Sequence, residues 1–188
     1  MDEIYESLKN PKSIDEISIP LNIGIYAFYT NSKCFLNTQL NQIESEECIY
    51  IGIAQDETLN QRILGSHFSH SGQSTFRRSL GAILRNKLNL DPIMRGVTVT
   101  KSNISNFRFC SESEKKLTNF MNQNLLIAFK SFNVTEHNLN DIEKKLIDKF
   151  GFPAFNLEYV GIKSKYYQII KEARKECRNI VKQRIDQR

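Results

Sequence analysis

The sequence lacks the features that would place the protein in a membrane or in a disulfide-bonded scaffold. Its longest uninterrupted apolar run is Leu125–Phe129, whereas a membrane-spanning helix needs about 20 apolar residues. The first residues are rich in charge, beginning with Asp2 and Glu3, and do not follow the pattern of a secretory signal. None of the 4 cysteines forms a Cys-x-x-Cys pair, so the sequence suggests neither a zinc knuckle nor a disulfide framework. We therefore expect a cytoplasmic protein with no membrane partner and no structural metal.

The composition is that of a soluble globular domain, but the charge is unevenly distributed. The chain has 188 residues, of which 40% are hydrophobic and 25% charged, as expected for one domain with a buried core. Residues 161–188 contain nine Lys or Arg and three Asp or Glu, a local charge of +6, which leaves −1 for the rest of the +5 total. Such asymmetry indicates an anionic partner, most often nucleic acid. A solvated surface helix is the alternative reading.

Hydrophobic periodicity and turn residues predict a mixture of strands and helices. Glycine-bearing strands are expected at Ile23–Thr30 and Cys48–Ala54, joined as an antiparallel pair through a long connection. Capping-box patterns at Thr58–Gln61 and Ser111–Glu114 open two helices. Further helices are predicted over 76–88, over 140–150 and from about 164, and further strands over 97–100, 107–110 and 125–132. Because these elements do not alternate strictly, the fold class is α+β around a small sheet.

Two charged side chains stand out from the helical pattern. Glu143 lies three and four residues before Leu146 and Ile147, on the apolar side of its helix, where a carboxylate is unfavourable unless it is paired, hydrogen-bonded or metal-bound. A capping box of Asn140 and Glu143 is the competing explanation. Arg62 is at the margin of an apolar helix face and is suited either to gripping a phosphate or to reaching into solvent.

The two histidines near the end of the same helix have a weaker case. His67 follows Arg62 by five residues, about 140° apart on an α-helix, so the two share a face poorly unless the helix ends or bends at Gly65. His70 follows in a polar break and is the alternative to His67 as a site residue.

The order of several short motifs is more specific than any one of them. Gly24-Ile25-Tyr26 is followed by Tyr50-Ile51-Gly52, by Arg62, by Glu143 on a late helix and by Asn156 after a Pro-containing turn. This ordered set resembles the GIY-YIG nuclease superfamily over roughly residues 23–157. The stretches "STFRRSLGAIL" and "LTNFMNQNLLIAF" are similar to a bacterial branch of small stand-alone GIY-YIG proteins. A third triplet, Tyr159-Val160-Gly161, follows Glu143 and so does not fit the required order.

The resemblance implies a three-stranded, mainly antiparallel sheet flanked by helices, with both triplets on neighbouring strands and both tyrosines in one site. On this basis we expect residues 1–20 to be a polar lead-in, 21–160 the nuclease domain and 161–188 a basic C-terminal helix. The spacing between the triplets is longer than is typical of the family, and we interpret the excess, including Glu44, Glu46 and Glu47, as an insertion in the hairpin loop. The histidine of related enzymes follows the arginine by about four residues rather than five.

The resemblance also implies an activity: a metal-dependent endonuclease that hydrolyses DNA phosphodiester bonds. A single Mg²⁺ or Mn²⁺ ion would be held mainly by Glu143, Arg62 would bind the scissile phosphate, and Tyr26 would act as the general base once a nearby cation lowers its pKa. Tyr50 would orient the phosphate or Tyr26, Asn156 would hydrogen-bond the metal shell or Glu143, and His67 is a further catalytic candidate. Candidate nucleic-acid contacts are Arg77 and Arg78, outside the chemistry, and the helix residues Lys171, Arg174, Lys175, Arg178 and Lys182.

The sequence leaves the biological role open between restriction, repair and mobile-element enzymes, acting on duplex or branched DNA. A restriction-type enzyme would form a homodimer to cut both strands. The alternative function is a non-catalytic nucleic-acid-binding module on the same scaffold, although such a module would not need a buried carboxylate. The basic C-terminal helix, docked by an apolar stripe from Tyr166 to Val181, is expected to be a DNA-backbone arm separate from the catalytic residues.

Overall fold

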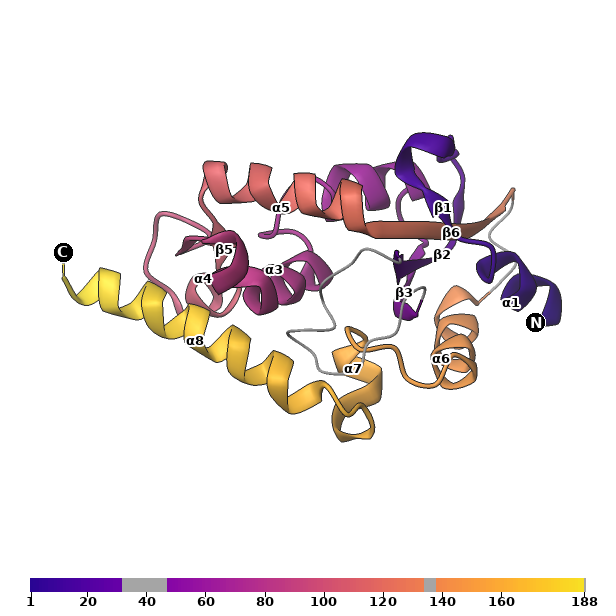
Figure 1. Cartoon of the computed structure of the whole chain (residues 1–188). Coiled ribbons are helices and arrows are strands. Elements are labelled where there is room, and N and C mark those ends of the chain that lie inside the picture. Colours follow the sequence, from indigo (N-terminus) through magenta and orange to yellow (C-terminus); the bar gives the residue numbers. More distant parts are fainter. Residues whose placement is uncertain (32–46, 134–137, 188) are drawn as a thin grey trace.

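A computed structural model describes residues 1–31, 47–133 and 138–187 of the chain. Its elements in chain order are α1 Asp2–Leu8, β1 Lys12–Ser13, η1 Ile14–Glu16, β2 Ile23–Thr30, β3 Cys48–Ala54, η2 Gln61–His67, α3 Thr75–Leu88, β4 Pro92–Ile93, α4 Lys101–Ser105, β5 Arg108–Phe109, α5 Ser111–Asn124, β6 Leu125–Phe132, α6 Leu139–Lys149, α7 Leu157–Val160, η3 Gly161–Lys163 and α8 Tyr167–Asp186. The predicted hairpin insertion, apart from Glu47, lies outside the described residues. The fold is α+β, as the sequence predicted, with the two ends of the chain at opposite ends of the molecule (Figure 1).

The main sheet has four antiparallel strands in the order β1-β6-β2-β3. Three of them form the expected core, and the fourth is the two-residue β1, which pairs with β6 from within the predicted lead-in. β2 pairs with β6 from Ile23↔Phe132 to Thr30↔Leu125. On its other side it pairs with β3, where Tyr26 is opposite Gly52 and Phe28 is opposite Tyr50. β3 is therefore an edge strand, and its outer edge is free to meet other parts of the chain.

Alternate residues of β2 enter two separate hydrophobic cores. Ile25, Ala27 and Tyr29 pack with residues of α1 and α6 on one face of the sheet. Tyr26 and Phe28 face the other way, into a larger core that includes residues of η2, α3 and α5. Because side chains of a strand alternate between faces, a strand covered on both sides is apolar throughout, as β2 is.

The C-terminal helix α8 runs along α3 and extends away from the sheet (Figure 1). Its apolar stripe docks as the sequence predicted, since Ile170, Cys177 and Val181 are almost fully buried. None of the helices over the described residues combines the length and low charge that a bilayer crossing requires.

Some local predictions were right and others were wrong. The bounds of β2, β3 and β6 are those expected, and the Thr58–Gln61 capping box forms, with reciprocal bonds of 2.9 and 3.2 Å. The predicted strand over 97–100 is wrong: the segment is a bend followed by irregular structure, with Val97 98% exposed. No strand of the described residues pairs with it. The second capping box is also wrong, because Cys110 occupies the N-cap of α5 and the Glu114 carboxylate is used elsewhere.

Candidate active site

The two tyrosines of the glycine-containing triplets lie on the same face of the sheet. Tyr26 faces Gly52 across the β2–β3 pair, and Tyr50, two residues before Gly52, points to the same side. The ring centroids of the tyrosines are 6.2 Å apart. A Cβ atom at Gly52 would overlap the Tyr26 hydroxyl and ring, and one at Gly24 would overlap the Lys130 carbonyl oxygen of β6. Gly52 therefore lets the Tyr26 side chain lie across β3, and Gly24 lets β2 pack closely against β6.

The segment that carries Arg62 and His67 is a π-helix rather than an α-helix. The backbone bond from Phe68 N to Ile63 O, 2.9 Å long, spans five residues. In this geometry residues five apart lie roughly above one another, so Arg62 and His67 reach the same side without a break at Gly65. Both approach Tyr26: the Tyr26 hydroxyl is 2.5 Å from His67 Nε2, and the Arg62 guanidinium exerts a stabilising charge on the ionised phenol. π-helical turns are frequent at functional sites for this reason.

A chain of buried polar groups holds His67 from behind. Its Nδ1 is 2.6 Å from Ser74 Oγ, and the same hydroxyl oxygen accepts the Arg77 backbone N–H at the start of α3. Tyr26, His67 and Ser74 are fully buried. The imidazole is thus fixed between a hydroxyl on each side, and its orientation is set by the N-cap of α3. His70 is outside this chain, since its Nδ1 accepts the backbone N–H of Gly72.

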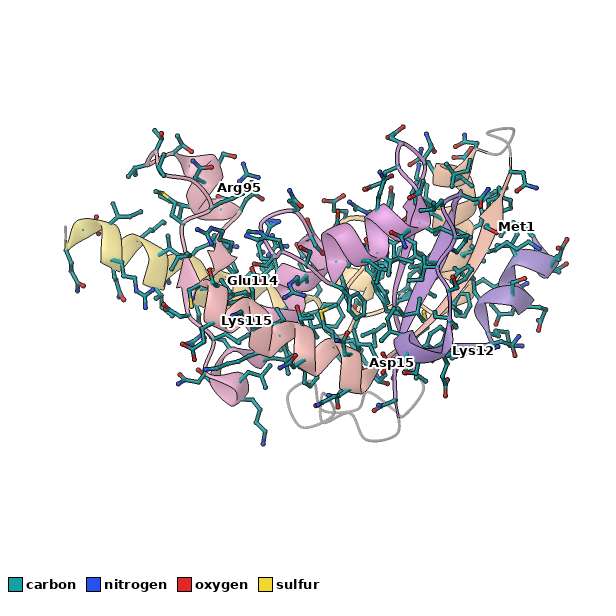
Figure 2. All side chains as sticks on the ribbon, turned by 90° about the horizontal axis from the view of Figure 1, so that it is seen from above. Met1, Lys12, Asp15, Arg95, Glu114 and Lys115 are labelled. Atoms are coloured by element: carbon teal, nitrogen blue, oxygen red, sulfur yellow. The ribbon has the colours of Figure 1, made fainter. Side chains whose placement is uncertain are left out.

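Arg77 is not at the surface, where a nucleic-acid contact would need it, because its guanidinium is fully buried. Arg77 Nε donates to Glu114 at 2.8 Å, Nη2 donates to Thr118 at 2.8 Å and Nη1 donates to the His67 carbonyl at 3.1 Å. Glu114, at the start of α5 (Figure 2), also accepts the backbone N–H of Ser71. The prediction that Arg77 anchors a phosphate is wrong. Its role here is to tie the end of the π-helix to α5.

Arg78 is also buried, with only 3% of its surface exposed. Its Nη1 donates to Asn106 Oδ1 at 2.7 Å. The prediction that Arg78 contacts nucleic acid directly is wrong, because this burial leaves almost no surface for a phosphate to reach.

Glu143 is buried on the apolar side of α6, as its position in the sequence predicted. The competing capping-box explanation is wrong: Asn138 is the N-cap, and its side chain accepts the Asp141 N–H. Burial raises the pKa of the Glu143 carboxyl to about 7, although neighbouring Tyr159 and Arg62 oppose the rise. α6 lies against β3, so Glu143 reaches the tyrosines from the edge of the sheet.

Asn156 has a different role from the one expected. Its Oδ1 accepts the Ile51 N–H at 2.9 Å and its Nδ2 donates to the Ile51 carbonyl at 2.7 Å. The neighbouring Phe155 N–H bonds the Ile49 carbonyl. These bonds occupy backbone N–H and C=O groups on the outer edge of β3, which has no strand neighbour there, and they fix the strand that carries Tyr50. Asn156 is thus a positioning residue, bonded to backbone rather than to Glu143.

One cavity of about 280 Å³ brings most of these groups together. Its lining combines predicted site residues with others that the sequence did not single out, namely Tyr50, Arg62, Thr75, Asn106, Glu143, Phe155, Asn156, Leu157, Glu158, Tyr159 and Arg174. Tyr26 and His67 lie behind it, against Tyr50. Tyr159, which belongs to the triplet that does not fit the motif order, is beside the Glu143 carboxylate. The position of Tyr159 in this cavity depends on tertiary contacts and could not be predicted from its local sequence.

The cavity also changes the prediction for α8. Arg174 lines it together with Arg62 and Glu143, so the helix contributes to the cavity that holds the candidate catalytic residues. Lys171 and Arg178 line an adjoining cavity. Lys175 is exposed and paired with Glu172 at 3.2 Å, and Lys182 is exposed farther along the helix.

Burial controls the protonation of the two groups behind the cavity. It raises the pKa of the Tyr26 phenol well above its ordinary value, with Tyr50 adding to the rise and Arg62 opposing it. It lowers the pKa of His67 well below its ordinary value, and Arg62 and Arg77 lower it further. Tyr26 is therefore a protonated phenol and His67 a neutral imidazole at neutral pH. The expected lowering of the Tyr26 pKa does not occur in the protein alone.

A family model for the GIY-YIG catalytic domain matches residues 24–176. The match begins at the first triplet and continues into α8, including Arg174. No curated protein and no solved structure matches the chain.

Proposed function

Because the chain belongs to the GIY-YIG catalytic domain family of nucleases, we propose that it is a metal-dependent endonuclease that hydrolyses phosphodiester bonds of DNA. The observation that carries the proposal is the shared cavity. It is lined by a buried carboxylate, Glu143, by a guanidinium, Arg62, and by a phenol, Tyr50, with the Tyr26–His67 pair directly behind. A binding module would have no use for a buried carboxylate there, because it repels phosphate and is unfavourable when ionised.

The donor set fits a divalent ion of the Mg²⁺ or Mn²⁺ type. Glu143 and Glu158 both line the cavity, and burial raises the Glu143 pKa, so a cation bound there would stabilise the ionised carboxylate. No cluster of three or more His, Cys, Asp or Glu occurs within the described ranges, which disfavours a tightly caged metal. Mg²⁺ needs only one or two protein carboxylates. When bound at Glu143, the ion would neutralise charge on the phosphate.

Arg62 is the residue best placed to bind the scissile phosphate. Its side chain is 30% exposed and shares one 3.3 Å ion pair with Glu57. Its Nε is buried without a hydrogen-bond partner among the described residues. A phosphate oxygen would satisfy this donor and would be stabilised further as negative charge develops in the transition state.

Tyr26 and His67 are the groups that can move a proton. The attacking water must lose a proton as it bonds to phosphorus, and a buried phenol is too weak a base unless a positive charge is nearby. Arg62 supplies part of that charge. Tyr26 Oη would take the proton from the water while its own proton moves to His67 Nε2, 2.5 Å away. Ser74 would hold the imidazole in place during the transfer.

A plasmid-nicking assay tests the proposal. Purified protein should convert supercoiled plasmid to the nicked or linear form in Mg²⁺ or Mn²⁺, and EDTA should stop the reaction. Glu143→Gln should abolish cleavage, whereas Asp148→Asn, the same charge change at an exposed position of α6, should not affect it. Linear product would indicate paired subunits, and nicked product a monomer.

The result that contradicts the proposal is DNA binding without any metal-dependent cleavage on duplex, branched and single-stranded substrates. That outcome would favour the binding-module alternative. Cleavage that persists unchanged in Glu143→Gln would remove this carboxylate from the mechanism and imply a contaminating nuclease.

A further inference from the structure

A second basic cavity adjoins the active-site cavity along α8. Tyr167, Lys171, Arg174 and Arg178 recur at i, i+4, i+7 and i+11, which places them on one face of the helix. Together with Leu157 and Glu158 they line a cavity of about 200 Å³. Leu157, Glu158 and Arg174 also line the active-site cavity. The two cavities therefore meet at Arg174, whose side chain borders both.

Three arginines of this region form no ion pair with a carboxylate of the described residues, unlike four other arginines of the fold. Ion pairs engage the guanidinium groups of Arg62, Arg77, Arg85 and Arg184. Within the described ranges, none involves Arg78, Arg174 or Arg178. The Nε atoms of Arg78 and Arg174 are buried and have no hydrogen-bond partner among the residues that the structure describes. A buried donor without a partner is unfavourable, so the protein alone leaves donors and positive charges that a bound ligand could satisfy.

Positive charge is concentrated here despite burial. Burial lowers the pKa of Arg174, and Arg178 lowers it further, while Glu158 partly opposes the change. Burial lowers the pKa of Arg78 to about 10, with additional effects from Arg174 and from Arg95, in the loop before α4 (Figure 2). Charges of one sign that crowd together without counter-charges repel each other. An anion next to Arg174 would reduce the repulsion between these groups.

We propose that Arg174, with Lys171 and Arg178, binds a backbone phosphate next to the scissile phosphate on the strand that is cut. The inference rests on the proposed function, because it identifies the occupant of the adjoining cavity as the continuation of the same strand. The planar guanidinium fork suits a phosphate. The site shares Arg174 with the catalytic cavity, and this continuity favours a tethered phosphate over a free one. Arg78 has no exposed surface to contact it and adds charge from behind.

Short thymidine dinucleotides can test the site without cleavage and without knowledge of the recognition sequence. TpT has one phosphate, and pTpT and TpTp each add a second at one end. Titrations followed by NMR in EDTA should show that the wild-type protein binds one of the two-phosphate probes on the order of tenfold more tightly than TpT. The end that gives the gain reveals the direction of the strand.

Arg174→Gln should lose this gain and bind the three probes about equally. Lys115→Gln is the control: the residue is exposed on α5, its replacement removes the same charge, and it lines neither cavity. Arg178→Gln is a second variant of the site, with a smaller expected loss. Because Arg174 has no ion pair in the described chain, its replacement should not lower the melting temperature, whereas a purely structural role would.

The inference would be overturned if neither two-phosphate probe gave a gain, or if the gain survived in both arginine variants. Equally tight binding of inorganic phosphate alone, lost in Arg174→Gln, would assign the site to free phosphate and overturn it as well. Failure of the proposed nuclease function can be distinguished from failure of the phosphate site. A gain that depends on Arg174, in a protein that cuts no DNA with Mg²⁺ or Mn²⁺, would keep the phosphate site and reject the enzyme.

Discussion

The stability of the protein should depend on pH through Glu143, and replacement by glutamine should remove that dependence. Burial raises the pKa of this carboxyl from 4.5 to about 7. Between these two values the unfolded chain is ionised at this position while the folded chain keeps its proton. The folded state therefore binds more protons, and its stability falls as pH rises from 4.5 to 7. Above pH 7 the full penalty of the buried charge remains.

The size of the effect follows from the two pKa values. The rise corresponds to about 3 kcal/mol at 1.36 kcal/mol per pKa unit. Because the carboxylate borders an open cavity, solvent screening reduces this to about 1–2 kcal/mol. For a chain of this size, 1 kcal/mol shifts the melting temperature by about 2–4 °C. Glu143→Gln should thus melt about 2–8 °C above the wild type at pH 8 and close to it at pH 5.

Thermal or urea unfolding of both proteins at pH 5, 6, 7 and 8, in EDTA, measures this difference. Asp148→Asn, on the exposed side of the same helix, should show no pH-dependent difference from the wild type. A Glu143→Gln protein whose stability differs from wild type by a constant amount at all four pH values would refute the reasoning. Added Mg²⁺ or Mn²⁺ at pH 8 should stabilise the wild type by mass action, and should have little effect on the variant.

Four further substitutions have defined expectations. Arg62→Ala should lower single-turnover cleavage about 10²–10³-fold by removing a charge contact to the transition state, and a smaller loss would place the phosphate elsewhere. Tyr26→Phe should cut comparably slowly while its DNA affinity, measured by fluorescence anisotropy, stays near wild type; unchanged rates would exclude the phenol as a base. Gly52→Ala should displace Tyr26 and reduce cleavage, with about 1–3 kcal/mol of destabilisation in urea melts, whereas full activity would show that Tyr26 needs no such space. Arg77→Met should lower the free energy of unfolding by about 3–5 kcal/mol, because it leaves the buried Glu114 carboxylate unpaired. A double variant that also carries Glu114→Leu should regain much of this stability; if it does not, loss of the ion pair is not the cause.

The strands and most helices could be predicted because their signals are local. Ile23–Thr30, Cys48–Ala54 and Leu125–Phe132 are runs rich in β-branched and aromatic residues, and each of them pairs with at least one of the other two in the sheet. The β-branched run at 97–100 gives the same local signal but has no partner strand in the part of the chain that the structure describes, and it remains a loop. Glu114 fits a capping box by spacing, yet the buried Arg77 competes for its carboxylate and forms the stronger, charge-assisted bond.

Parts of the candidate site were visible in the sequence, and other parts depend on tertiary contacts. The position of Glu143 on an apolar stripe predicted its burial correctly. The relation of Arg62 to His67 did not follow from α-helical geometry, because it depends on a π-helical turn with i to i+5 bonding. Arg174 and Tyr159 enter the cavity only because α7 and α8 fold back against it, an arrangement that their local sequence does not encode.

The proposed function would explain why the charges around the cavity are not paired with one another. Glu143 has a raised pKa and Arg174 a lowered one, and both line the same space. If the two groups only stabilised the fold, a direct ion pair would relieve both. Yet within the described ranges no ion pair joins Glu143 to any arginine. The fold instead holds a carboxylate suited to a cation apart from guanidinium groups suited to phosphate, at a cost in stability that bound metal and DNA would offset.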